Sequence, residues 1–234
     1  MMSTTVDISI IILFKTKDIK FYRALRSAQF ASEIMVVENQ KINDFSRVRN
    51  QAMENASHEW VFFLDSDEMI ASASIPEIKS IVRDNILDGV VINRQDVFYG
   101  HLLSYGEAGK SKLLRMGKRN KITWQRPVHE IARVRGQIGG SNIKVIHDAH
   151  DSIDEFMTAI INYSQLEANY RIQDNRQPNL YKLVFYPIGK FIHNYFFKRG
   201  YADGWAGFCY AFMMSLHSFG VRVFQYELKF KDPS

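Results

Sequence analysis

The stretch from Trp60 to Glu68 constrains this chain more than any other. It reads Trp-Val-Phe-Phe-Leu-Asp-Ser-Asp-Glu, so an apolar run of strand length ends in three carboxylates within four residues. In an α/β sheet, ligands bind at the carboxyl ends of strands. Carboxylates gathered there repel one another, and a bound Mg²⁺ or Mn²⁺ ion, which in turn binds a diphosphate, would explain them. A solvated acidic loop explains the same spacing equally well, because short Asp-x-Asp matches are common by chance.

Composition bounds the remaining possibilities. At 234 residues, the chain is long enough for one large domain or for one domain with an appendage. A net charge of +5 suits nucleotides, phosphates or an acidic membrane surface, whereas the absence of a long basic block argues against nucleic acid. The single cysteine, Cys209, excludes an internal disulfide framework and favours a reducing compartment, so we expect a cytoplasmic location. Because Asp7 precedes the first short apolar run, we expect a strand there and no signal peptide.

Strand and helix patterns alternate over the first 90 residues. Continuous apolar runs predict buried strands at 8–13, 33–37, 60–64 and 89–93. Helices are expected to begin at Asp18, at Asn43 or Asp44, and at the capping box Ser74-Ile75-Pro76-Glu77. This order predicts an α/β fold whose sheet is mostly parallel and flanked by helices.

Residues 94–147 carry shorter strand patterns broken by glycines, typical of an antiparallel or mixed extension, with strands expected at 111–115, 128–134 and 144–146. A second capping box, Ser152-Ile153-Asp154-Glu155, predicts a long helix to about residue 176. We therefore expect a catalytic domain over residues 1–150 and a helical extension over residues 151–234.

The extension is aromatic and basic. Residues 204–221 carry no formal charge, and the length of this uncharged stretch is close to the roughly 18–20 residues needed to cross a membrane. Because this stretch contains three glycines and several polar residues, we favour an interfacial or core-packed helix pair over a membrane span. The composition fits peripheral contact with a membrane, and equally a helical cap on the sheet or on a second subunit.

Several short motifs follow one another in a consistent order. They are Glu38-Asn39, Phe45 to Ala52, Trp60 to Glu68, Asn93 to Gly100, Leu113-Leu114-Arg115, Trp124, Val128-His129-Glu130 and Ile146-His147. In this order they resemble the family-2 glycosyltransferases of the GT-A fold, and most closely the bacterial branch that adds sugars to lipopolysaccharide core or other cell-envelope glycans. The resemblance covers most of the chain. It implies a metal-dependent, inverting transfer from a nucleotide-sugar donor, expected to be UDP-linked, to an envelope glycan or lipid-linked acceptor at the cytoplasmic membrane face.

The resemblance also implies roles for individual residues. Asp67, with Asp65 and His147, is expected to hold Mn²⁺ or Mg²⁺, which neutralises the charge that develops on the departing diphosphate. Asp65 could equally reach the ribose of the donor. The remaining donor-binding candidates are Phe14, Glu38, Asn39, Arg49 and Arg94.

Transfer to an acceptor requires a general base. Glu130 is the candidate for this base, with His129 expected to orient it or to touch the sugar. Trp124 is expected to stack on an acceptor sugar and Arg115 to flank the same pocket, although a buried tryptophan and a surface arginine explain these two positions as well.

Two other functions fit part of the pattern. A nucleotidyltransferase also needs carboxylates and a metal beneath a nucleotide, but the chain lacks a glycine-rich basic loop near its first strand. A non-catalytic module could use the acidic edge to bind a cation, a nucleotide or a glycan without chemistry. The sequence leaves the donor sugar, the acceptor and the oligomeric state open.

Overall fold

The computed structural model describes residues 5–38, 45–125 and 130–231. The chain divides into two compact units. Unit 1 contains residues 1–95 and 111–149, and unit 2 contains residues 96–110 and 150–234. Residues 96–110 therefore group with the C-terminal helices, although in the sequence they lie within the stretch 1–150.

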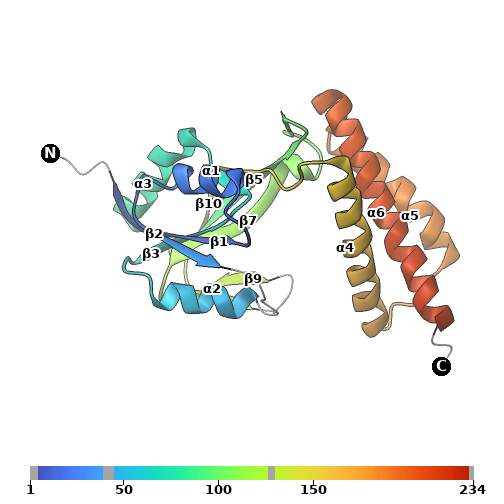
Figure 1. Ribbon diagram of the computed structural model, residues 1–234, viewed down its shortest axis with the longest axis horizontal. Coiled ribbons are helices and arrows are strands. Elements are labelled where there is room, and N and C mark those ends of the chain that lie inside the picture. Colours follow the sequence, from blue (N-terminus) through green and yellow to red (C-terminus); the bar gives the residue numbers. More distant parts are fainter. Residues whose placement is uncertain (1–4, 39–44, 126–129, 232–234) are drawn as a thin grey trace. The chain divides into compact units, whose positions relative to one another are not determined.

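Unit 1 is built on a mixed sheet with helices on its faces (Figure 1). Its helices are α1 (Ile19–Ser27), α2 (Phe45–Glu54), α3 (Ile75–Asp84) and the short 3₁₀ turn η1 (Ser72–Ser74). Its strands are β1 (Val6–Phe14), β2 (Ala31–Glu38), β3 (Trp60–Asp65), β4 (Glu68–Ile70), β5 (Gly89–Phe98), β7 (Ser111–Lys118), β8 (Ile122–Gln125), β9 (Ile131–Val134) and β10 (Ile138–His147). The strand order is β2-β1-β3-β7-β5-β10-β4, and β8 and β9 form a separate hairpin.

The expected α/β class is confirmed. Strands β2, β1 and β3 pair in parallel, and β5 runs in their direction because β7 is antiparallel to both β3 and β5. The sequence pattern placed the fourth strand after the third in a parallel series. The structure instead inserts β7 between β3 and β5, because a strand far along the chain supplies the missing hydrogen-bond partners of both.

The parallel strands have apolar residues on both faces, as their continuous patterns predicted. Ile10 and Ile12 of β1 pack in a core cluster with Phe21 of α1, while Ile11 and Leu13 pack with Ala52 of α2 on the opposite face. A strand buried between two helical layers has no polar face, which explains the lack of alternation in its sequence.

Of the four predicted helix caps, three lie in the described residues; two of these behave as expected and one does not. The Asp18 carboxylate accepts the backbone N–H of Phe21, and Ser152 Oγ accepts that of Glu155. Ser74, by contrast, lies in η1 in a helical conformation and makes no cap of this kind. Its Oγ accepts the backbone N–H of Lys144 instead, which ties the start of α3 to β10. The predicted cap at Asn43 or Asp44 lies outside the described residues.

Unit 2 consists mainly of helices. They are α4 (Ile153–Gln173), α5 (Leu180–Ile192), the π-helical turn η3 (His193–Phe197), the 3₁₀ turn η4 (Gly200–Asp203) and α6 (Gly204–Lys231). Residues 96–110, which we call the loop segment of this unit, add β6 (His101–Leu102) and η2 (Ala108–Lys110). None of the helices in the described parts of the chain has the length and hydropathy needed to cross a membrane.

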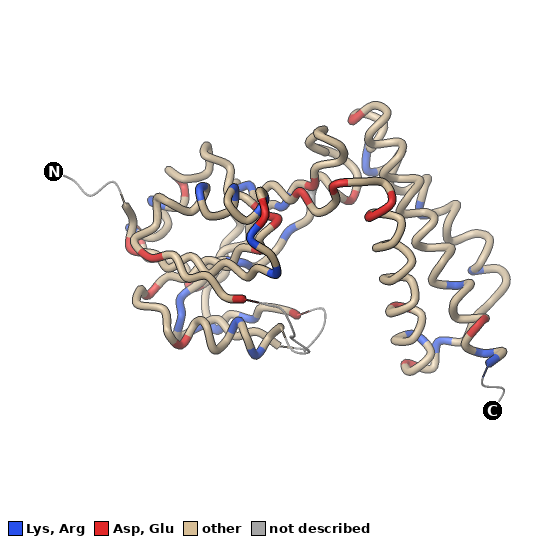
Figure 2. Tube along the Cα trace, viewed as in Figure 1, with Lys and Arg blue, Asp and Glu red and all other residues tan. Residues whose placement is uncertain are grey.

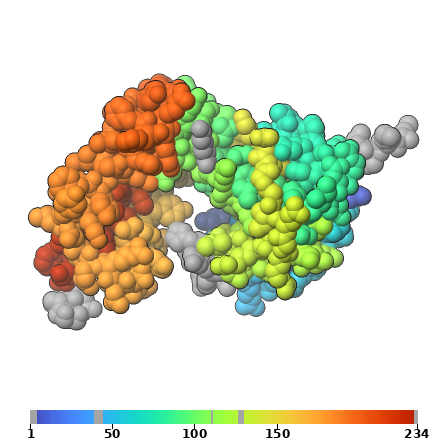
Figure 3. Space-filling model, turned by 180° about the vertical axis from the view of Figure 1, so that it is seen from behind, coloured from blue at the N-terminus to red at the C-terminus, as the bar shows by residue number. Residues whose placement is uncertain are grey.

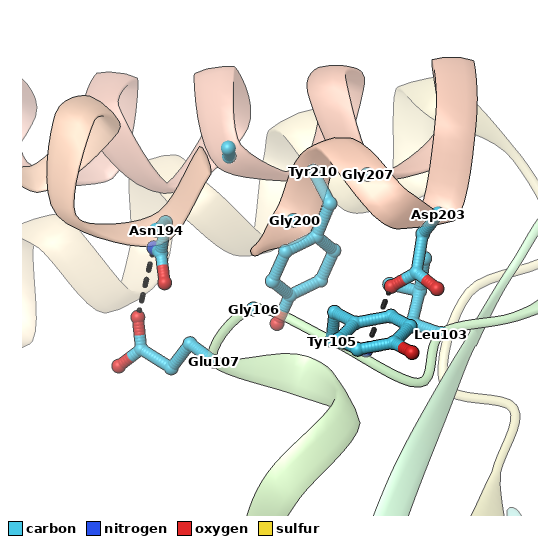
Figure 4. A pocket seen from close by; sticks show the side chains of 10 residues that line it. Leu103, Tyr105, Gly106, Glu107, Asn194, Gly200, Asp203, Gly207 and Tyr210 are labelled. Atoms are coloured by element: carbon cyan, nitrogen blue, oxygen red, sulfur yellow. Dashed lines mark hydrogen bonds between the residues drawn. The ribbon is translucent and has the colours of Figure 1, made fainter. Parts of the chain in front are cut away.

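The loop segment is fastened to the helices by polar contacts. The Asp203 carboxylate accepts the backbone N–H groups of Ser104 and Tyr105, and Asn194 donates to Glu107 (Figure 4). Tyr105, Glu107, Asn194 and Asp203 line a small pocket with about 200 Å³ of empty space. The contacts explain why residues 96–110 belong to the helical unit.

Candidate active site

The predicted strand ends meet at one edge of the sheet. In the registers of β1 with its two neighbours, Leu13 lies beside Asp65 and Phe14 lies beside Glu38. Two candidate donor-binding residues and the start of the acidic motif are therefore held side by side by backbone pairing. The adjacent candidate Asn39 lies outside the described residues.

Asp65 lies between Arg49, which is buried, and Arg115, whose side chain is 11% exposed. Its Oδ1 accepts a hydrogen bond from Arg49 Nη2 at 2.7 Å, and its Oδ2 accepts one from Arg115 Nη2 at 2.9 Å. Burial by itself would raise the pKa of Asp65, but the positive charges of Arg115 and Arg49 outweigh this effect and hold the pKa well below its usual range. Both oxygens of Asp65 thus accept hydrogen bonds from guanidinium groups, and the metal role of this residue stays a prediction.

Arg49 connects Asp65 with the candidate base. Its Nε and Nη2 donate to Glu130 Oε1 at 3.3 and 3.1 Å, across 81 residues of sequence. The Arg49 side chain is only 2% exposed, so its ion pairs with Asp65 and Glu130 are not surface contacts of that residue. The neighbouring candidate His129 lies outside the described residues.

Trp124 supports both arginines. The guanidinium carbon of Arg49 lies 4.6 Å from the centre of its ring, and that of Arg115 lies 5.6 Å away. Such cation–π contacts hold a guanidinium group without neutralising it. With Trp124 5% exposed, a sugar could stack on this ring only after the ring had been uncovered, so its acceptor role stays a prediction.

Asn50 fixes Trp124 to the sheet-facing helix α2. Its amide donates to the Trp124 carbonyl oxygen at 3.0 Å, and its Oδ1 accepts the Trp124 backbone N–H at 2.9 Å. This pair of hydrogen bonds joins α2 to β8, the strand that precedes Glu130. Asn50 lies within the motif from Phe45 to Ala52, but no role was predicted for it. Its position next to Arg49 on the helix was the available signal.

Glu68 is the most buried carboxyl group of the site. It accepts the backbone N–H of Asp65 at 3.1 Å and lies 3.8 Å from Arg94 Nη1 and from Arg115 Nη2. Burial raises its pKa, the Arg115 charge opposes this effect, and the charges of Asp65 and Asp67 add to it. Arg94 and Arg115 both approach this carboxyl group, so the structure places both on the acidic motif.

Asp67 and His147 form a second contact at the same edge. His147 Nε2 lies 3.5 Å from Asp67 Oδ2, and the backbone pairing of β10 with β4 sets His147 beside Glu68. Among the residues that the structure describes, no three His, Cys, Asp or Glu side chains gather in a metal-binding cluster. A carboxylate and an imidazole fit Mn²⁺ or Mg²⁺ as two ligands, provided that substrate oxygens and water supply the others.

Two basic residues of this region were missed by the sequence analysis. Lys20 and Arg23 of α1 line a shallow pocket together with Asp67 and Asp148, with about 210 Å³ of empty space. Arg23 Nη1 lies 3.5 Å from Asp148 Oδ2. Their spacing of three residues on a helix that follows the first strand was the signal for a shared face. They place positive charge beside the acidic motif.

Phe14 is less accessible than the base-stacking role requires. It is 7% exposed, its ring centre lies 4.9 Å from that of Phe21, and Lys17 Nζ lies 5.6 Å from the same ring. Its place at the strand edge agrees with the prediction, but its contacts in the described structure are with the protein's own side chains.

Together, the fold and this edge define a class of protein: an α/β enzyme of the nucleotide-binding kind, with carboxylates and arginines at the carboxyl ends of parallel strands. Residues 22–137 match the model of glycosyl transferase family 2. The chain belongs to this family.

A curated relative is the lipopolysaccharide core biosynthesis glycosyltransferase LpsC of Rhizobium meliloti (strain 1021). It is 27% identical over 179 residues, which cover 72% of this chain. The aligned region spans 64% of the length of that relative.

Solved structures with some likeness include TarS 1–349 of S. aureus in complex with UDP and GalNAc-T7 with UDP, GalNAc and Mn²⁺. The TarS structure is 10% identical, with coverage of 97% of this chain and 92% of that chain and a TM-score of 0.43. For GalNAc-T7 the identity is 10%, the coverage is 62% and 44%, and the TM-score is 0.41. These TM-scores are too low to define the ligands of this chain.

Proposed function

We propose that the chain is an inverting glycosyltransferase that moves a sugar from a nucleotide-sugar donor, UDP-linked, to an envelope glycan or a lipid-linked acceptor. The observation that carries the proposal is the chain of contacts Glu130–Arg49–Asp65–Arg115 at the carboxyl ends of the strands. It joins a candidate base to the acidic motif in one site. Membership of glycosyl transferase family 2 supports the reaction class, and the name of the LpsC relative supports the acceptor class.

The donor diphosphate would lie beside the acidic motif. Lys20 and Arg23 supply positive charge there, and Asp67 and His147 would hold a divalent ion. Such an ion supplies neutralisation of the charge that develops on the leaving diphosphate. The Nη1 atoms of Arg49 and Arg115 are buried and have no hydrogen-bond partner among the described residues, so each retains a donor for an anionic oxygen or a water molecule.

Glu130 would remove the proton from the acceptor hydroxyl group. The acceptor oxygen then forms a bond to the anomeric carbon as the bond from that carbon to the diphosphate oxygen breaks, and the electron pair leaves with the nucleoside diphosphate. Attack opposite to the leaving group inverts the anomeric configuration. Arg49 orients Glu130 through two hydrogen bonds and links it to Asp65.

A panel of nucleotide sugars tests the proposal. The purified chain with Mn²⁺ is expected to hydrolyse one donor slowly in the absence of acceptor, and Asp67→Asn is expected to reduce this hydrolysis at least tenfold, on the order of one lost charge-stabilising interaction. Asp84→Asn is the matched control, because Asp84 lies on α3 and contacts only Ser80 and Arg83 among the contacts described. Glu130→Gln is expected to retain donor binding and to lose transfer to an acceptor.

The outcomes distinguish the alternatives. NMR that shows opposite anomeric configurations in the donor and in the product would support inversion. Release of pyrophosphate from a nucleoside triphosphate and a sugar phosphate would identify a nucleotidyltransferase instead. If no donor binds or is hydrolysed with any divalent ion, the chain is a non-catalytic module and the proposal is wrong.

A further inference from the structure

The outer face of α5 exposes a row of large apolar side chains. Its members are Tyr181, Val184, Phe185, Ile188 and Ile192, each between 40% and 64% exposed. They recur at intervals of three and four residues, which places them on one side of a helix. The opposite side of α5 faces α6, where Ser215 Oγ donates to the Pro187 carbonyl oxygen. In the space-filling view the orange residues of α5 lie at the outer surface of unit 2 (Figure 3).

The row continues across η3 and onto α6. Phe196 and Phe197 are 56% and 77% exposed. Tyr195 contacts Phe196 and also Phe208 of α6, with ring centres 5.0 and 5.6 Å apart, and Phe208 stacks on Phe212 at 6.5 Å. Phe191 of α5 also contacts Tyr195 and Phe208, with ring centres 5.4 and 5.7 Å apart, so the rings of α5, η3 and α6 form one connected aromatic surface. We call it the aromatic face; it comprises the five α5 residues together with Phe196, Phe197, Phe208 and Phe212.

The charge around the aromatic face is almost entirely positive. Between residues 180 and 212 the sequence holds four basic residues and a single acid, Asp203. That acid is occupied by the backbone N–H groups of the loop segment, and Lys190 pairs with Glu107 at 2.5 Å. Lys182 and Lys198 are exposed, and they follow Tyr181 and Phe197 directly in the sequence. Figure 2 shows how sparse acidic residues are along α5 and the first turns of α6.

This combination identifies one occupant. Interfaces between protein chains are enriched in aromatic residues but depleted of lysine at their centre. Phospholipid surfaces, by contrast, take up aromatic side chains at the level of the headgroups and attract lysines through anionic lipids. A monomeric soluble protein also rarely exposes so large a contiguous apolar patch. Since no described helix can span a bilayer, such a helix would lie in the plane of its surface.

We propose that the aromatic face docks onto the surface of an anionic lipid bilayer. The outer face of α5, η3 and the Phe208–Phe212 stripe enter the headgroup region, while Lys182 and Lys198 contact anionic headgroups. The proposal concerns unit 2 and does not depend on the reaction proposed for unit 1.

Flotation with vesicles tests the proposal on the full chain. The protein is expected to float with phosphatidylglycerol-rich vesicles and to bind phosphatidylcholine vesicles more weakly. Phe185→Gln combined with Phe197→Gln should reduce binding to both at least about tenfold, because each substitution removes apolar area from the bilayer. The matched control is Ile19→Gln combined with Ile86→Gln, which removes two equally exposed apolar residues from unit 1 and should leave binding unchanged.

The lysines are tested separately. Lys182→Gln combined with Lys198→Gln should weaken binding to anionic vesicles by about fivefold per lysine, and leave binding to phosphatidylcholine unchanged. Donor hydrolysis in solution should be the same in all these variants. A loss of hydrolysis in Asp67→Asn, conversely, should leave flotation unchanged, so failure of one proposal is distinguishable from failure of the other.

Two results would overturn the docking proposal. One is a chain that stays unbound with anionic vesicles at low salt. The other is a stable dimer in light scattering that dissociates on the Phe185 and Phe197 substitutions, because the face would then be covered by a second copy.

Discussion

Asp65→Asn is the sharpest test of the buried ion-pair network. The carboxylate, whose side chain is 31% exposed, faces Arg49 and Arg115 at 2.7 and 2.9 Å, and these two arginine side chains are 2% and 11% exposed. Removing one partner of a buried ion pair costs about 3–5 kcal/mol, because an uncompensated charge is left behind. Glu130 still faces Arg49 at 3.1 Å and Glu68 still lies 3.8 Å from Arg115. We therefore expect the lower end of the range, about 3 kcal/mol of lost free energy of unfolding.

Urea unfolding followed by tryptophan fluorescence measures this loss. A Trp205→Phe background leaves Trp60 and Trp124, both in unit 1, as the only fluorescent tryptophans. With a slope of about 2 kcal/mol per molar urea, the midpoint should fall by about 1.5 M.

Asp67→Asn is the matched control from the same motif. Asp67 is about as exposed as Asp65, but its described contact is a single imidazole at 3.5 Å and not two arginines, so the change should cost less than about 1 kcal/mol. Both substitutions are expected to impair transfer, and only stability separates them. Equal midpoints for the two variants would refute the network as described.

Three further substitutions probe other parts of the structure. Asn50→Ala removes both hydrogen bonds to the Trp124 backbone and should lower the unfolding free energy by about 2 kcal/mol in urea titrations, with a loss of transfer larger than the loss of donor binding. Glu33→Gln should destabilise the chain by about 1 kcal/mol at pH 7. Burial raises the pKa of Glu33, but hydrogen bonds from Ser9 and Ser57 outweigh this effect and lower the pKa below 4.5, so the ionised form stabilises the fold. Thermal unfolding at a series of pH values below 4.5 should therefore show the difference from wild type disappearing as the pH falls. Gly207→Ala would place a methyl group against the Gly200 carbonyl oxygen and should lower the free energy of unfolding by about 1–3 kcal/mol. Circular dichroism should then show a lower melting temperature, and an unchanged melting temperature would contradict the close packing of α6 on η4.

Local patterns predicted much of unit 1. The runs 8–13 and 60–64 were assigned as buried strands because a strand covered on both faces has no polar alternation, and both lie in β1 and β3. The caps at Asp18 and Ser152 followed from side chains that bond within three residues of their own position. Ser74 shows the limit of that reasoning, since its hydroxyl group bonds to Lys144, 70 residues away.

The candidate site shows a similar division. Short motifs pointed to Asp65, Arg49, Arg115 and Glu130, so residue types and their local spacing were enough to select the candidate site residues. The motifs did not predict which of these side chains pair with one another. Asp65 was expected to hold a metal or to reach the ribose, and both roles stay predictions; its pairing with two guanidinium groups was not predicted.

By itself, the sequence determined the α/β class, the strand edge and the residues gathered there, because apolar periodicity and capping act over a few residues. Only the tertiary structure decided that β7 separates β3 from β5, that Arg49 reaches Glu130, and that rings of α5, η3 and α6 contact one another. These contacts join residues that are far apart along the chain, and their partners are selected by which faces are left unpaired once the whole chain has folded.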